Sequence, residues 1–283
     1  MRRLRFSLQL FALASLTGCV ALPEPSVAWR GSAVKEGYRV TRNLIYTPPG
    51  WSEAIPADFY QPETALPAPA VLLIHGGGWT GKDGRWQMDP IARQLVKRGY
   101  AVLNVTYRLA PKYLYPAPVE DMREALRWMR EHASAEGIDA QRIAVFGYSA
   151  GGYLAAMAGY TEPPGSLRAV VAGGTPANLS LYPGGKLVPQ FLGGTRDEIP
   201  NRFREASPVN HISENSPPTF IYHATDDKLV PREHAWDLIH GLEENQVPHE
   251  VYWIDGRGHV AAFLFPGDAI NRSIDFLDSV MRK

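Results

Sequence analysis

The sequence contains almost no cysteine, because Cys19 is the only one among its 283 residues. A chain with a single cysteine can form no intrachain disulfide and no metal site built on several thiolates. Net charge is missing as well, since 29 Lys and Arg residues balance 29 Asp and Glu residues. We therefore expect neither nucleic acid nor another polyanion as a partner.

Internal repeats and low-complexity tracts are also absent from the sequence. Hydrophobic residues make up 45% of the chain and charged residues 20%, which is ordinary for a globular protein with a substantial core. The length suits one large α/β domain or two small domains.

The N-terminal segment has the pattern of a secretory signal. Arg2, Arg3 and Arg5 make its start positive, and the apolar stretch 6–16 that follows is too short to span a bilayer. Residues 16–19 (Leu-Thr-Gly-Cys) then resemble the lipobox of bacterial lipoproteins, which is cleaved before a cysteine whose sulfur carries a diacylglycerol. The alternative is an ordinary signal peptide with an incidental cysteine.

This resemblance predicts three parts of the chain. Residues 1–18 would be a lipoprotein signal peptide, residues 19–37 a lipidated tether attached at Cys19, and residues 38–283 the folded domain. It also implies a lipid-anchored protein of the bacterial cell envelope. An Asp directly after the cysteine would oppose sorting to the outer membrane, but this position holds Val20. We therefore expect the protein to be anchored in the outer membrane and to face the periplasm.

Short apolar runs alternate with amphipathic segments along most of the folded part. Buried strands are expected near residues 70–74, 101–105, 143–146, 169–172 and 219–223, with a further strand at 250–254. Helices are expected near 89–98, 119–132, 153–160, 233–244 and 269–281. This alternation predicts an α/β fold whose mostly parallel sheet is covered by helices on both faces.

Two segments depart from that alternation. Residues 38–46 alternate apolar and polar side chains, as an exposed antiparallel strand does, and 55–60 could pair with them. Residues 174–216 are rich in Pro and Gly and show little periodicity. Such a segment is either a lid or binding loop over a site or a plain surface excursion, and the sequence leaves both open.

The stretch 142–152 carries the first chemical signal. An apolar run ends in Gly147-Tyr148-Ser149-Ala150-Gly151, followed by another Gly and an apolar helical segment. Strand, sharp turn and helix are the context of a nucleophile elbow, which places Ser149 at the sheet edge. Glycines are needed there because neighbouring Cβ atoms would clash with the strand and helix. The pentapeptide alone can arise by chance, so its flanks support the interpretation.

A serine nucleophile needs a base, an acid that orients the base, and donors for an oxyanion. The run 75–78 (His-Gly-Gly-Gly) follows a predicted strand, and its glycines allow backbone N–H groups to face a substrate. We predict an oxyanion hole formed by the amides of Gly77, Gly78 and Ala150. The alternative is a glycine-rich turn without a ligand. His75 is expected to fix this loop by hydrogen bonding and not to act as a base.

Four motifs taken together resemble a known family. Residues 75–79, 107–111, 116–121 and 147–152 are similar to the α/β-hydrolase fold, and to its hormone-sensitive-lipase-like and feruloyl/acetylxylan-esterase-like (BD-FAE-like) carboxylesterases. The resemblance runs from about residue 38 to the C-terminus. It implies an α/β-hydrolase catalytic domain over 38–283, a small-molecule ester substrate, and neither metal nor other cofactor. A long N-terminal cap is lacking, so the site would be more open.

The same resemblance supplies the remaining catalytic candidates. The family's acid lies four residues before the Pro that opens the next helix, which selects Asp227 before Pro231, with Asp226 as the competing choice. Residues 256–259 (Gly-Arg-Gly-His) resemble the family's Gly-x-Gly-His and select His259 as the base.

The remaining candidates receive structural roles. His211 and His223 are expected to satisfy local hydrogen bonds. Arg108 and Asp121 are expected to form a partly buried ion pair that locks the loop under the site.

The resulting prediction is a membrane-tethered carboxylesterase in which Ser149, His259 and Asp227 form a triad and an acyl-enzyme is hydrolysed by water. One rival is an amide-directed hydrolase of the same fold, such as an aryl formamidase or a serine peptidase. Pocket shape distinguishes these activities and the triad does not. A second rival is a non-catalytic lipoprotein that uses the fold for binding.

Overall fold

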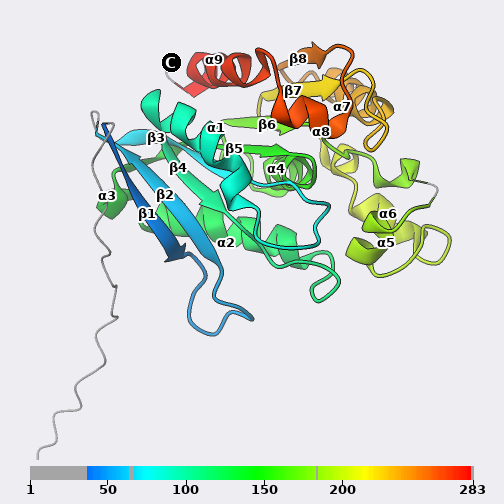
Figure 1. Ribbon diagram of the computed structural model, residues 1–283, viewed down its shortest axis with the longest axis horizontal. Helices are drawn as coiled ribbons and strands as arrows, with labels where there is room; N and C mark the ends of the chain where they lie inside the picture. Colours follow the sequence, from blue (N-terminus) through cyan, green and yellow to red (C-terminus); the bar gives the residue numbers. More distant parts are fainter. Residues whose placement is uncertain (1–36, 64–66, 183, 282–283) are drawn as a thin grey trace, which may run out of the picture. The chain divides into compact units, whose positions relative to one another are not determined.

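The computed structural model describes residues 37–63, 67–182 and 184–281. The predicted signal peptide, Cys19 and nearly all of the predicted tether lie outside these residues. The described chain forms an eight-stranded sheet in the order β1-β2-β4-β3-β5-β6-β7-β8, with helices on both faces (Figure 1). Within the described ranges, no helix combines the length and the apolar character needed to cross a membrane.

The centre of the sheet is parallel, as predicted. Its strands in spatial order are β4 (Ala101–Val105), β3 (Ala68–Ile74), β5 (Ile138–Tyr148), β6 (Ala169–Gly173), β7 (Thr219–Ala224) and β8 (His249–Ile254). β1 (Tyr38–Ile45) and β2 (Pro56–Pro62) form the antiparallel edge that the alternating pattern predicted. β3, β4, β6 and β7 are buried along their whole length, which explains their continuous apolar sequences.

Alternate residues of the strands face two separate hydrophobic layers. Leu72 packs in one layer with α2 (Ala117–Glu131), α4 (Ala150–Thr161) and α7 (Glu233–Glu244). Val71 and Leu73 pack in the other layer with α1 (Arg85–Lys97), α8 (His259–Leu264) and α9 (Ala269–Met281). Each Å² of apolar surface that these two layers bury contributes about 25 cal/mol, so the layers provide most of the stabilisation of the fold. The short α3 (Ala133–Glu136) leads into β5.

The segment 174–216 is more regular than its sequence predicts. It contains η1 (Leu179–Leu181), α5 (Leu187–Leu192), α6 (Pro200–Glu205) and η2 (Pro208–His211), each too short to give a clear helical period. Phe191 anchors the segment, because its ring stacks on Trp79 at a centroid distance of 4.4 Å and meets Tyr153 edge-on at 5.5 Å. Aromatic packing therefore holds this segment against α4 and the loop after β3.

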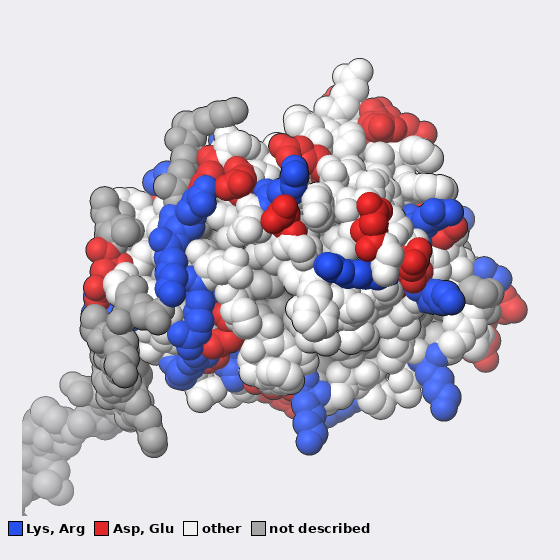
Figure 2. Space-filling model, turned by 45° about the horizontal axis from the view of Figure 1, so that its top comes forward, with Lys and Arg blue, Asp and Glu red and all other residues white. Residues whose placement is uncertain are grey.

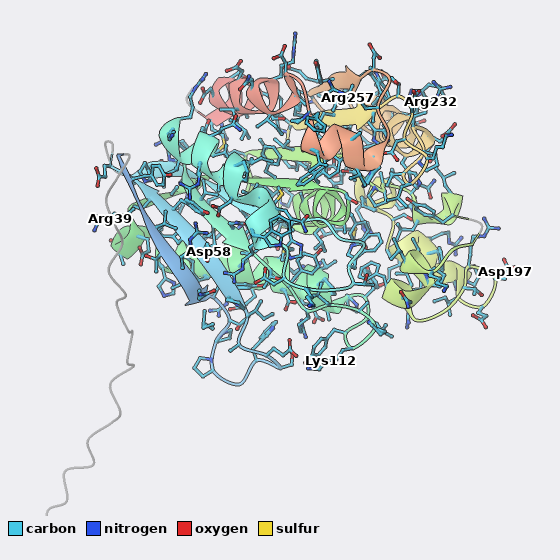
Figure 3. All side chains as sticks on the ribbon, in the orientation of Figure 1. Arg39, Asp58, Lys112, Asp197, Arg232 and Arg257 are labelled. Atoms are coloured by element: carbon cyan, nitrogen blue, oxygen red, sulfur yellow. The ribbon has the colours of Figure 1, made fainter. Side chains whose placement is uncertain are left out.

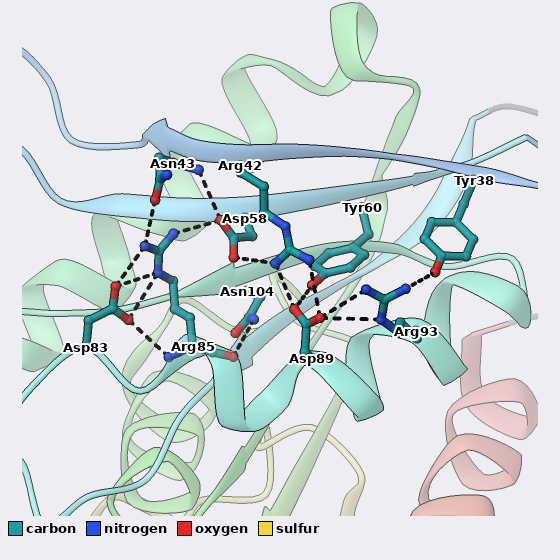
Figure 4. Close-up of polar contacts among 10 residues, drawn as sticks. All are labelled: Tyr38, Arg42, Asn43, Asp58, Tyr60, Asp83, Arg85, Asp89, Arg93 and Asn104. Carbon is teal, nitrogen blue, oxygen red and sulfur yellow. Dashed lines mark hydrogen bonds and ion pairs between the residues drawn. The ribbon is translucent and has the colours of Figure 1, made fainter. Parts of the chain in front are cut away.

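A polar network joins the antiparallel edge to α1 (Figure 4), and its member Asp58 is labelled among the side chains of Figure 3. Asp58 on β2 receives Arg42 at 2.7 Å and Arg85 at 2.9 Å, and Arg42 also reaches Asp89 at 2.7 Å. The side-chain amide of Asn104 donates to the carbonyl of Arg85 at 2.9 Å. Because Arg85 is the first residue of α1, these contacts fix the position at which the helix begins, four residues earlier than predicted.

Charged side chains are distributed without a dominant sign on the face drawn in Figure 2, where basic and acidic groups lie interspersed among uncharged ones. This distribution agrees with the equal numbers of basic and acidic residues.

The predicted pair of Arg108 and Asp121 is confirmed and is deeply buried. Asp121 is 0% exposed. One carboxylate oxygen accepts from Arg108 Nε at 2.8 Å and from Trp51 Nε1 at 3.0 Å, and the other accepts from the Arg108 amide at 2.8 Å. The pair therefore ties the loop after β4 to the N-terminal part of α2.

Replacing this carboxylate should destabilise the protein strongly. Asp121→Ala removes three hydrogen bonds and leaves the Arg108 guanidinium buried and short of a counterion, so we expect a loss of about 3–5 kcal/mol in the free energy of unfolding. Glu120→Ala is the matched control, because Glu120 contacts the same guanidinium at 3.0 Å but its side chain is 46% exposed. The control should lose about 1 kcal/mol or less in urea denaturation. Equal losses in the two variants would contradict this view of the pair.

Candidate active site

Ser149 lies on a strained turn between β5 and α4. Its backbone φ and ψ are 57° and −123°, a region that non-glycine residues rarely occupy. A Cβ added at Gly147 would lie 2.1 Å from the carbonyl oxygen of Gly151, and one added at Gly151 would lie 2.1 Å from that of Ile74. The expected need for glycine at these two positions is therefore confirmed.

The side chains of Ser149, His259 and Asp227 form one hydrogen-bonded row. His259 Nε2 lies 2.8 Å from Ser149 Oγ, and His259 Nδ1 lies 2.6 Å from Asp227 Oδ2. The three residues follow β5, β8 and β7, whose carboxyl ends share one edge of the parallel sheet. Asp227 is only 6% exposed, whereas the neighbouring Asp226 is exposed. The structure thus brings Asp227, and not Asp226, to the imidazole.

Backbone amides hold the carboxylate of Asp227 in this orientation. Its Oδ1 accepts from the N–H of Leu229 at 2.9 Å and of Val230 at 2.8 Å, which leaves Oδ2 for His259. Because a carboxylate can only accept, the proton of the neutral imidazole lies on Nδ1. Nε2 is then the acceptor for the hydroxyl of Ser149.

Tyr148 is a contributor that sequence reasoning missed. Its hydroxyl donates to the backbone carbonyl of His259 at 2.7 Å, and the two rings lie 5.1 Å apart. Burial raises the pKa of Tyr148, so the phenol stays protonated and remains a donor. The available signal was a tyrosine inside an otherwise apolar buried strand, since a buried phenol normally has a hydrogen-bond partner.

Contacts of His75 hold the glycine loop after β3 in place. The ring of His75 stacks on Tyr107 at 4.6 Å, and its Nε2 lies 3.0 Å from Thr106 Oγ1. Burial lowers the pKa of His75, which favours the neutral ring. The loop itself has φ of 113° at Gly77 and 62° at Gly78, both accessible to glycine at little cost. His75 therefore fixes the loop by hydrogen bonding and stacking, as expected.

A cavity of about 430 Å³ opens beside the serine. Gly78 and Ala150, two of the predicted oxyanion donors, line it together with Ser149. A second wall comes from residues 181, 182 and 184–188, within the segment 174–216. That segment therefore forms part of the cavity beside Ser149 and is not a plain surface excursion.

The other histidines singled out in the sequence have local partners. His211 Nε2 contacts the carbonyl of Glu205 at 2.6 Å, and His223 Nε2 donates to the carbonyl of Val230 at 2.8 Å. Their structural assignment agrees with these contacts. In the described part of the chain, no group of three or more His, Cys, Asp or Glu side chains is arranged to hold a metal ion.

Comparison with known proteins places this geometry in context. The chain is 27% identical over 271 residues to the esterase LipC of Mycobacterium tuberculosis, an alignment that covers 85% of this chain and 66% of LipC. An esterase structure from Pyrobaculum calidifontis shares 27% identity with a TM-score of 0.69, covering 86% of this chain and 85% of that one. A truncated carbohydrate esterase from gut microbiota shares 22% identity with a TM-score of 0.80, covering 89% of this chain and all of that one, and this likeness is one of fold.

A second M. tuberculosis relative, the probable carboxylic ester hydrolase LipM, is 29% identical over 65% of this chain. The chain spans just under two thirds of the length of LipC and about half the length of LipM. The family model BD-FAE matches residues 57–242, from β2 to the end of α7. This match covers well over half of the chain and includes the glycine loop, the serine elbow and the loop that carries Asp227. The chain belongs to the BD-FAE family of the α/β-hydrolase fold.

Proposed function

We propose that this protein is a serine hydrolase that cleaves small carboxylic esters through an acyl-enzyme. The single observation that carries the proposal is the continuous hydrogen-bonded row from Ser149 through His259 to Asp227. The names of several relatives as esterases support the ester class.

The first half of the reaction follows from these positions. Ser149 Oγ attacks the ester carbonyl carbon while His259 Nε2 takes the hydroxyl proton, and Asp227 stabilises the imidazolium that forms. The amides of Gly77, Gly78 and Ala150 are the proposed donors to the developing oxyanion. His259 then gives its proton to the leaving alcohol, which departs as the acyl-enzyme forms.

The second half repeats this chemistry with water. His259 takes a proton from the attacking water, and the carboxylic acid leaves as Ser149 Oγ regains the proton.

We also propose that the protein is a lipoprotein anchored through Cys19 to the outer membrane and facing the periplasm. Three features of the N-terminal segment support that location: its positively charged start, the apolar stretch 6–16 and the lipobox-like tetrapeptide that ends at Cys19.

The nucleophile is tested by covalent labelling. Ser149→Ala should abolish reaction with a fluorophosphonate probe, because no oxygen remains at the position that His259 activates. Residual hydrolysis should come only from the oxyanion donors and substrate binding. The exposed Ser213 offers the control variant Ser213→Ala, which should label like the wild type. Labelling of the Ser149→Ala protein at the wild-type rate would move the nucleophile elsewhere.

The acid is tested by two adjacent substitutions. Asp227→Asn presents an amide N–H₂ to His259 Nδ1 and forces the imidazole proton onto Nε2, the wrong tautomer for a base. The corresponding change in chymotrypsin-type proteases lowers kcat by on the order of 10⁴, and we expect a similar loss of kcat/KM on an activated ester. Asp226→Asn is the control, since its exposed carboxylate acts on His259 only through a screened charge. A greater loss in Asp226→Asn would refute the assignment.

The anchor is tested by metabolic labelling of the full-length chain with palmitate. The wild-type protein should incorporate label and sediment with membranes. Cys19→Ser removes the acylated sulfur, so this variant should lose the label and either accumulate unprocessed or leave the membrane fraction. Absence of label from the wild-type protein would refute lipidation at Cys19 while leaving the esterase proposal untouched.

A further inference from the structure

The cavity beside Ser149 has an unbalanced set of polar groups. The described residues that line it include Lys186 and Lys228 but no Asp or Glu, although the chain as a whole has equal numbers of basic and acidic residues. The two lysines come from separate parts of the chain, one from the segment 174–216 and the other from the loop after Asp227, and both are exposed. Neither is ion-paired with a described carboxylate, so both charges are available to a ligand.

A third polar group that lines the cavity, the imidazole of His234, is also a donor. His234 on α7 is 0% exposed, and its Nδ1 accepts the backbone N–H of Asn178 at 3.2 Å. Since a backbone amide can only donate, Nδ1 carries no proton. Burial lowers the pKa of His234 to about 4, so the ring is neutral at physiological pH. Its single proton therefore lies on Nε2.

That proton has no acceptor. His234 Nε2 is buried and has no hydrogen-bond partner among the described residues. The ring of Tyr182 lies against His234 at 4.7 Å, but the Tyr182 hydroxyl is directed to the carbonyl of Leu229 at 3.2 Å and does not serve the imidazole. Leaving a buried donor unpaired is unfavourable. Because Nε2 has no accessible surface in this structure, a ligand in the cavity that His234 lines can supply the acceptor once the ring turns toward it.

Two ammonium groups and one imidazole N–H favour one kind of ligand group. A neutral alkyl chain would match the apolar walls but would leave the His234 donor unpaired and gain nothing from the lysines. A carboxylate has up to four acceptor positions and a full negative charge, and the two exposed lysines attract it through a partly screened interaction.

We propose that the natural substrate carries a carboxylate in addition to its ester, and that this carboxylate binds in the cavity near Lys186, Lys228 and His234. The proposal rests on the esterase function proposed above. The carboxylate takes no part in bond making or breaking. It orients the substrate so that the ester carbonyl lies at Ser149 Oγ, and the preference should appear in kcat/KM.

The test uses two matched pairs of chromogenic or aromatic esters. In the first pair the acyl group differs: mono-4-nitrophenyl adipate against its methyl ester, 4-nitrophenyl methyl adipate. In the second pair the alcohol differs: 4-acetoxybenzoate against methyl 4-acetoxybenzoate. For each ester, the rate measured with the Ser149→Ala protein is subtracted as the background. We expect kcat/KM to favour the anion by about tenfold or more in at least one pair, and the ratio to fall as NaCl is raised, because salt screens the lysines.

Lysine variants then assign the preference to the cavity. Lys186→Gln and Lys228→Gln should each lower the anion-to-neutral ratio by about fivefold, as expected for a partly screened charge at close range. Lys82→Gln is the control, since Lys82 is exposed and does not line the cavity. This control should leave the ratio at its wild-type value.

The contribution of His234 is measured with a matched pair of variants. His234→Phe removes both the acceptor for the Asn178 amide and the Nε2 donor, whereas His234→Gln offers an amide N–H near the position of Nε2. The anion-to-neutral ratio should therefore be higher in His234→Gln than in His234→Phe. If either variant fails to fold, the two lysine variants still decide the proposal.

Three outcomes are distinguishable. A ratio at or below one in both ester pairs, or a ratio unchanged in both lysine variants, would overturn the anionic substrate while leaving the esterase function intact. Failure of the wild-type protein to hydrolyse any of the four esters faster than Ser149→Ala would instead overturn the esterase proposal itself.

Discussion

The close backbone approach around Ser149 is the constraint on which the site depends. Gly147 and Gly151 allow β5, the first turn of α4 and the end of β3 to pack at distances that no side chain would permit. This packing holds the serine at a φ of 57° with its hydroxyl at the carboxyl edge of the sheet. A strained residue persists only where the surroundings determine it, and here the fully buried β3, the buried C-terminal half of β5 and the buried helix α4 do so.

The loops that meet the serine are each held by contacts of their own. Backbone amides orient Asp227, the Tyr148 hydroxyl holds the carbonyl of His259, and stacking on Tyr107 holds His75 under the glycine loop. These supports are polar or aromatic groups within an apolar fold, and they limit the reorganisation needed at the moment of reaction.

Much of the cavity wall comes from a different part of the chain than the triad. The segment 174–216 adds one wall of the cavity and contributes Lys186, while α7 contributes His234, which packs against the same segment. Neither element belongs to the elbow or to the glycine loop, so the pocket can vary without disturbing the triad. The charged side chains among its described lining residues, Lys186 and Lys228, are both basic, and they are the basis of the anionic substrate proposed above.

The sequence by itself determined the α/β class, the parallel sheet, the elbow at Ser149 and the glycine loop, because each depends on local pattern: continuous apolar runs, helical periods and obligatory glycines. The resemblance to the family, through the spacing to Pro231, implied Asp227 over Asp226, but the distance to His259 was decided only by the tertiary structure. The roles of Tyr148 and His234 and the regular parts of 174–216 were also beyond the sequence. They depend on which side chains meet across strands and helices more than 50 residues apart, and such contacts leave no periodic trace in the chain.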